Sequence, residues 1–232
     1  ILKVAFLMLI ANSIMLTAHS QDMVALVKKV KAKLDAVNDY VATGTMKTDV
    51  TFIKAPIGSV KIFYKKPNKF KLKKDGGISI LPKGGVTVNM SSIVTTDEFD
   101  VLFAGEEMVS GVKTKKVKLL PRNDNSDVVL TTMFIDEANL LIRKAITTTK
   151  ENGTYEIEMG YGKYSNYGLP DKLTFSFNTK DYKMPKGITM EFDDDDKASK
   201  EMKEKMKNKK GKVEISYSSY VINKGVDDSM FK

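Results

Sequence analysis

The spacing of apolar residues divides the chain into two parts. Between residues 22 and 40, apolar side chains recur every three or four positions, which predicts an amphipathic helix with lysines mostly on its other side. From Thr43 onward, apolar and polar residues alternate in short runs, which is typical of β-strands exposed on one face. The apolar positions of the predicted helix are Met23, Val27, Val30, Leu34, Val37 and Val41.

Turn residues separate the alternating runs at short intervals. Pro67-Asn68, Gly84-Gly85 and Glu151-Asn152-Gly153 each follow one run and precede the next. Many short strands after one early helix predict a mainly β (α+β) chain with an antiparallel sheet, and not alternating βαβ units. No long linker interrupts the pattern, so we expect residues 21–232 to form a single domain. Beyond the first three strands, runs are predicted at residues 99–103, 113–120, 128–135, 140–149, 154–161, 172–178, 188–192 and 213–222.

The first residues of the chain differ from all that follows. Lys3 is the only charged side chain before Asp22, residues 4–16 are almost entirely apolar, and small residues follow at 17–20. This order is typical of a secretory signal, and the apolar run is shorter than the ~20 residues that span a bilayer. We therefore expect residues 1–20 to be a cleaved signal peptide and the remaining chain to be exported, without a lipid anchor of its own.

Composition excludes most common catalytic chemistries. The chain has no cysteine, and its single histidine, His19, lies in the expected signal. Thiol nucleophiles, Ser-His-Asp triads and His- or Cys-based metal sites therefore cannot be built. Glu106 and Glu107 are paired carboxylates, but their position predicts a turn between strands. We expect neither catalytic residues nor a cofactor nor a metal, and an enzyme that uses carboxylates alone stays a remote alternative.

The chain is basic, with 38 Lys+Arg against 29 Asp+Glu and a formal net charge of +9. Only Arg122 and Arg143 are arginines, so the positive charge is almost all lysine, which lacks the planar fork that reads phosphates and bases. We expect no nucleic-acid binding and a weak contact with anionic membrane surfaces. The aspartates at 193–196 and the lysine-rich stretch to Lys212 are expected to form a solvated helix or loop; calcium binding by the four aspartates is the weaker alternative.

Several short motifs recur in a recognisable order. In chain order, the motifs are Lys66-Pro67-Asn68-Lys69-Phe70, then Glu106-Glu107-Met108-Val109-Ser110-Gly111, then the pair Phe134-Ile135-Asp136 and Leu141-Ile142-Arg143-Lys144, and last Gly168-Leu169-Pro170. With the signal and the helix before them, these motifs resemble the LolA-like outer-membrane lipoprotein-sorting (lipoprotein carrier) family over nearly the whole exported chain. The resemblance implies an incomplete antiparallel β-barrel, a curved sheet wrapped around the N-terminal helix, with an apolar cavity for acyl chains.

The function implied by this resemblance is that of a periplasmic carrier. Such a carrier holds acyl chains of lipoproteins or lipids, receives them from an inner-membrane releasing complex and passes them to an outer-membrane acceptor. We expect a monomer. The alternative is a non-enzymatic interaction or structural protein of the envelope, in which side chains fill the barrel. Strand alternation selects the residues expected to line the cavity: Met46, Val50, Phe52, Ile62, Phe70, Leu72, Phe134, Ile142 and Phe175.

Overall fold

The computed structural model describes residues 22–50, 53–67, 69–74, 99–182 and 210–231. The expected signal peptide at 1–20, the predicted strand at 188–192 and nearly all of the charged stretch 193–212 lie outside the described residues. Among the described residues, no helix has the length and apolar character needed to cross a membrane.

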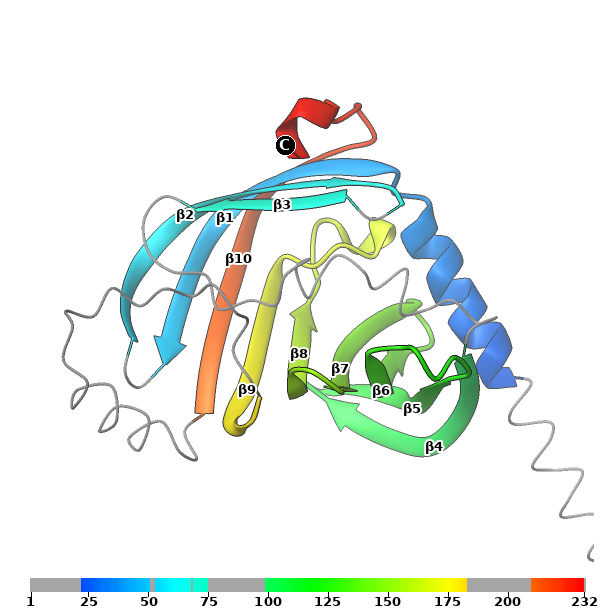
Figure 1. Cartoon of the computed structure of the whole chain (residues 1–232). Coiled ribbons are helices and arrows are strands. Elements are labelled where there is room, and N and C mark those ends of the chain that lie inside the picture. Colours follow the sequence, from blue (N-terminus) through cyan, green and yellow to red (C-terminus); the bar gives the residue numbers. More distant parts are fainter. Residues whose placement is uncertain (1–21, 51–52, 68, 75–98, 183–209, 232) are drawn as a thin grey trace, which may run out of the picture.

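A single antiparallel sheet of ten strands makes up most of the described chain (Figure 1). Its spatial order is β3-β2-β1-β10-β9-β8-β7-β6-β5-β4, so β10 pairs with β1 while all other neighbours are consecutive in sequence. The sheet curves strongly, but its end strands β3 and β4 do not pair with each other, which leaves the barrel incomplete as predicted. The strands are β1 (Asp39–Val50), β2 (Ile53–Lys65), β3 (Lys69–Lys74), β4 (Phe99–Val109), β5 (Val112–Pro121), β6 (Val128–Asp136), β7 (Leu141–Thr149), β8 (Gly153–Gly160), β9 (Lys172–Tyr182) and β10 (Lys210–Ile222).

Two short 3₁₀ helices complete the described elements. The helix η1 (Ser165–Tyr167) lies in the connection from β8 to β9, and η2 (Asp228–Phe231) follows β10 at the C-terminal end.

The N-terminal helix spans residues 22–35 and is shorter than the apolar spacing predicts. Tyr40 and Val41 belong to β1, where they pair with Tyr64 and Phe63 of β2. The physical reason is that Tyr40 and Ala42 also fit a period of two, and cross-strand pairing satisfies their backbone groups as a helix would. The spacing of Val37 and Val41 therefore continued the helical pattern by coincidence.

One face of the sheet, here called the inner face, carries the core. Met23, Leu26, Val27 and Val30 of the helix are buried there against residues from β1, β2 and β4 to β10. A second, smaller cluster lies beside it around Val37, Tyr40, Ala42, Ile62, Tyr64, Leu169 and Tyr220. The helix thus covers the inner face, as the alternation along the strands requires.

The opposite, outer face is covered in places by lysine side chains. Phe134 on β6 lies between Lys116 of β5 and Lys144 of β7, whose ammonium groups are 5.3 and 5.5 Å from its ring centre. The ring is only 1% exposed although it is outside both core clusters. Lysine stems are apolar and can cover a ring while the charge remains in water.

Candidate ligand-binding site

A small cavity lies between the two core clusters. Ile142 and Met159 belong to the larger cluster, whereas Tyr40, Tyr64 and Tyr220 belong to the smaller one, and all five line the cavity. Its volume is about 60 Å³, which is room for a few water molecules but well below the roughly 300 Å³ of ordinary ligand pockets. Cargo the size of an acyl chain therefore needs the two clusters to separate.

The roof of this cavity is the C-terminal part of the helix. Val30 and Leu34 lie over it, and Val37 continues the roof just after the helix ends. On the other side of the cavity, Leu140, Leu141 and Ile142 come from the β6–β7 hairpin. The cavity can therefore widen if the end of the helix moves away from the hairpin.

Tyrosines supply much of the wall, and they carry no reactive charge. The hydroxyl of Tyr161 donates to the carbonyl of Ile142 at 2.9 Å, and that of Tyr220 donates to the carbonyl of Pro170 at 2.8 Å. Burial raises the pKa values of Tyr40, Tyr161 and Tyr220 well above their usual range. These hydroxyls stay neutral at physiological pH, so the wall presents rings and not phenolates to a ligand.

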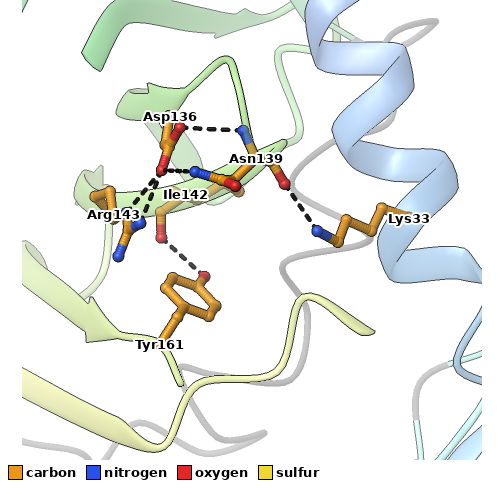
Figure 2. Close-up of polar contacts among 6 residues, drawn as sticks. All are labelled: Lys33, Asp136, Asn139, Ile142, Arg143 and Tyr161. Atoms are coloured by element: carbon orange, nitrogen blue, oxygen red, sulfur yellow. Dashed lines mark hydrogen bonds and ion pairs between the residues drawn. The ribbon is translucent and has the colours of Figure 1, made fainter. Parts of the chain in front are cut away.

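A buried ion pair fixes the hairpin next to the cavity (Figure 2). Arg143 donates to the Asp136 carboxylate from Nη2 at 2.7 Å and from Nε at 3.2 Å, and the Asn139 side chain donates to it at 2.9 Å. Burial alone would raise the pKa of Asp136, but the hydrogen bonds from Arg143 and Asn139 outweigh it and leave the pKa below its usual value. The network holds Leu140 at φ +53, a left-handed conformation that leucine rarely adopts.

The same hairpin is tied to the helix. Lys33 donates from Nζ to the backbone carbonyl of Asn139 at 2.7 Å, which links the roof to the rim (Figure 2). Partial burial lowers the pKa of Lys33, and the nearby Asp136 opposes part of that shift. A single hydrogen bond to a charged donor contributes about 1.5–3 kcal/mol at most, and less where it is exposed. The contact can therefore order the roof without locking it.

The carboxylates singled out from the sequence have no arrangement for acid–base catalysis. Glu106 and Glu107 lie within β4, not in a turn, and bond to Lys115 and Lys116 of β5. Hydrogen bonds from Lys113 and Lys115 lower the pKa of Glu106 to about 2. Each described carboxyl group whose pKa departs from its ordinary value is shifted downward, namely Glu106, Asp136, Glu214, Asp227 and Asp228.

The nine residues expected to line a cavity lie in different parts of the structure. Ile142 lines the small cavity directly. Phe134 does not face inward at all, since it lies on the outer face under two lysines. The side chains of Val50 and Phe52 lie outside the described part. The others are on the inner face, away from the cavity wall: Met46, Ile62 and Phe175 within the core clusters, and Phe70 and Leu72 packed against them.

Sequence reasoning missed the tyrosines of the wall. Tyr40 lies at the start of β1, a few residues after the helix, and pairs with Tyr64, while Tyr217 and Tyr220 lie near the end of β10, the strand beside β1. The available signal was that aromatic residues repeat at strand ends next to the end of the helix. That signal is weak without the pairing of β1 with β10, which joins the two ends of the chain.

A wider hollow of about 530 Å³ lies on β8, β9 and β10 near Asp49. Its lining is mixed: Ile146, Tyr155 and Phe177 are apolar, whereas Glu156 and Lys212 are charged. A charged lining does not suit an acyl chain, because the methylene groups gain only where they leave water for apolar surroundings. We therefore take the smaller cavity as the candidate site.

Gly168 allows the C-terminal part of the helix, which roofs the cavity, to lie close to the connection between β8 and β9. It has φ +69, and a Cβ at this position would lie 2.9 Å from Cδ2 of Leu34 on the helix. We expect Gly168→Ala to lower the free energy of unfolding by about 1–2 kcal/mol, partly from the backbone and partly from displaced Leu34. Gly225→Ala is the control, because Gly225 has φ +85 but nothing within 4 Å of the new Cβ.

Urea unfolding and amide hydrogen exchange of residues 22–35 measure the difference between these two variants. The Gly168 variant should lose more stability than the Gly225 variant and exchange its helix amides faster. Equal losses with unchanged helix exchange would show that Leu34 does not hold the roof against Gly168.

Comparison with known proteins shows likeness of fold and not of sequence. No protein-family profile matches this chain, and no curated protein does. A solved domain from Vibrio parahaemolyticus, named for outer-membrane lipoprotein sorting, is 10% identical, with a TM-score of 0.57 over 92% of this chain and 97% of that one. A DUF1329 family protein from Desulfovibrio piger is 13% identical, with a TM-score of 0.55 over the same shares of the two chains, 92% and 97%. A LolA superfamily protein from Nitrosomonas europaea is 9% identical with a TM-score of 0.49, and the match covers 89% of this chain and 97% of that one.

Proposed function

We propose that this chain, which has a LolA-like fold, is a periplasmic carrier that binds acyl chains of lipoproteins or lipids. The observation that carries the proposal is the cavity between the two core clusters, roofed by the helix end and walled by apolar and aromatic side chains. Because the two core clusters meet at this cavity, they can separate there and open a space for a ligand. Each methylene buried there would contribute about 0.8 kcal/mol.

Opening and closing would follow from the contacts of the helix. Its N-terminal half is anchored by Met23, Leu26 and Val27 in the large cluster, whereas its C-terminal half covers the cavity. Cargo would displace Leu34 and the Lys33–Asn139 contact while the anchored half stays in place. Handover then needs a receptor with greater affinity for the acyl chain or for the open form. In this role the chain would meet an inner-membrane releasing complex and an outer-membrane acceptor, act as a monomer and need no cofactor.

The downward pKa shifts of the carboxyl groups support binding over catalysis. A general acid at neutral pH needs a raised pKa, and the described carboxyl groups with shifted values are shifted the other way. The absence of cysteine and of any histidine beyond His19 points the same way.

The small size of the cavity favours a second candidate, an interaction or structural protein whose barrel is filled by side chains. Because the cavity between the two clusters holds only about 60 Å³, the described side chains around it are already close to a packed core. The two candidates differ in one property, because only the carrier opens to admit a chain.

Fatty-acid probes of increasing length separate the two candidates. For the carrier, we expect saturable binding of a fluorescent acyl probe, with affinity rising as methylenes are added, by up to about 0.8 kcal/mol for each. Competition by unlabelled fatty acids measures the series, and short acids serve as the control. Absence of binding at every chain length would favour the filled barrel.

A further inference from the structure

The outer face of β2 and β3 carries a concentration of positive charge. Five lysines, here called the lysine face, project from these two strands, and two pairs of them are directly opposite: Lys61 with Lys73, and Lys65 with Lys69. Like charges at directly opposite positions destabilise a sheet. The residues of the lysine face are Lys61, Lys65, Lys69, Lys71 and Lys73.

Within the part of the chain that the structure describes, only one of these opposed pairs has an acidic partner. Asp228 of η2 lies 2.8 Å from Lys65 and 3.1 Å from Lys69. Among the described residues, no carboxylate forms an ion pair with Lys61 or Lys73. Their ammonium groups instead lie 5.5 Å from the ring centre of Phe63, which is only 5% exposed beneath them.

The far end of the same sheet is arranged differently. There, on the outer face, Lys116 pairs with Glu107 and Lys144 pairs with Glu156. Acidic partners thus occur on the outer face where β4 to β8 lie, while β2 and β3 present lysines. Over the described part of the outer face, positive charge is therefore not spread evenly, and lysines gather on β2 and β3 at one edge of the sheet.

The chemistry of the lysine face suits a broad anionic surface. Lysine is a flexible point charge and attracts phosphate groups without the bidentate geometry that arginine provides. Lys69 and Lys73 are four residues apart on one strand, so the row extends for about 13 Å. Ile57, four residues before Lys61 on β2, is 66% exposed and can enter the headgroup layer beside the charges.

We propose that the lysine face is a docking surface for membranes that contain anionic phospholipids. Docking would bring the carrier to the bilayer that supplies or receives its cargo. The inference goes beyond the proposed carriage of acyl chains and is independent of the cavity, because the lysine face lies on the other face of the sheet.

Vesicle cosedimentation tests the proposal, with equimolar phosphatidylcholine and phosphatidylglycerol compared with phosphatidylcholine alone. The protein is taken from a secreting host with its N-terminus verified, since an uncleaved apolar leader would bind both kinds of vesicle. The variant is Lys61→Gln/Lys73→Gln. The matched control is Lys118→Gln/Lys224→Gln, which removes the same charge from exposed sites elsewhere. Circular dichroism and thermal melting verify that both variants are folded.

We expect the parent to bind the anionic vesicles and not the neutral ones, and more weakly as salt is added. At about 1 kcal/mol for each lysine near an anionic surface, loss of two lysines should weaken vesicle binding by the lysine-face variant about thirtyfold, whereas the control should bind close to the parent. No preference for anionic vesicles, or equal losses in the two variants, would overturn the proposal. Equally tight binding of soluble polyglutamate through Lys61 and Lys73 would also overturn it and indicate an acidic protein as the partner. None of these results depends on acyl-probe binding, so the two proposals fail separately.

Discussion

Replacing Asp136 with alanine should cost this protein about 3–5 kcal/mol of folding free energy. The carboxylate is only 4% exposed and accepts hydrogen bonds from Arg143 and Asn139, so its removal leaves a largely buried guanidinium without its partner. Breaking one side of a buried ion pair is far more harmful than losing an exposed one. Urea unfolding at neutral pH measures the loss, which should also lower the melting temperature by about 10 °C.

Asp100→Ala provides the matched control. Asp100 pairs with Arg122 at 2.8 Å, nearly the same distance as the 2.7 Å between Asp136 and Arg143. The side chains of Asp100 and Arg122, however, are both more than half exposed. Its removal should change the free energy of unfolding by less than about 1 kcal/mol. Similar losses for Asp136→Ala and Asp100→Ala would contradict the structural role given to the hairpin network.

The contribution of Asp136 should also depend on pH. Its pKa is lower in the folded chain than in the unfolded chain, so its stabilising effect is complete above the unfolded pKa, near 3.9. The effect is lost as the pH falls through the folded pKa. The parent and Asp136→Ala should therefore differ fully at pH 7 and progressively less below about pH 4.

Ile142→Glu should abolish most acyl-probe binding while leaving the protein folded. Ile142 lines the cavity, where about 60 Å³ of free space lets water reach a new carboxylate. We expect the variant to lose about 2–3 kcal/mol of stability and at least tenfold in probe affinity, because a charge would replace apolar wall. Fluorescence titration and urea unfolding measure the two effects on the same sample.

Comparing Ile62→Glu with Ile142→Glu distinguishes a position in the packed core from one in the cavity wall. Ile62 is 1% exposed within the smaller cluster and does not line the cavity. The carboxylate of a glutamate at this position would therefore be buried without water or a partner, and should unfold much of the protein. If both glutamate variants fold and bind the probe as well as the parent does, the cavity is not where acyl chains bind.

Periodicity alone was enough to predict the class of fold. The apolar residues that alternate along β2, Val60, Ile62 and Tyr64, are all buried on the inner face. The runs predicted at 113–120 and 128–135 end within one residue of β5 and β6, whereas β4 continues from 103 to Val109. The helix was also predicted from its spacing, whereas the incomplete barrel was implied by the resemblance to the lipoprotein-carrier family. Helical and strand periodicity is local, so a window of ten to twenty residues contains the information that those predictions need.

The details of the site depend on contacts that are distant in sequence. Alternation placed Phe134 on an apolar face, but only the lysines of β5 and β7 reveal that the outer face can bury a ring. Tyr220 reaches the cavity because β10 pairs with β1, more than 170 residues away in the chain. Asp136 and Arg143 were recognised as a motif, yet their ion pair became visible only with the hairpin in place.

Native mass spectrometry of the exported protein, purified without detergent, tests the acyl-binding claim most directly. The carrier account predicts a species heavier than the polypeptide, which loses the extra mass on denaturation and yields acyl lipids on extraction. Ile142→Glu, purified in the same way, should carry much less of this lipid. A parent protein with the bare polypeptide mass, which also stays bare after incubation with acyl lipids, would contradict the account and leave the filled barrel.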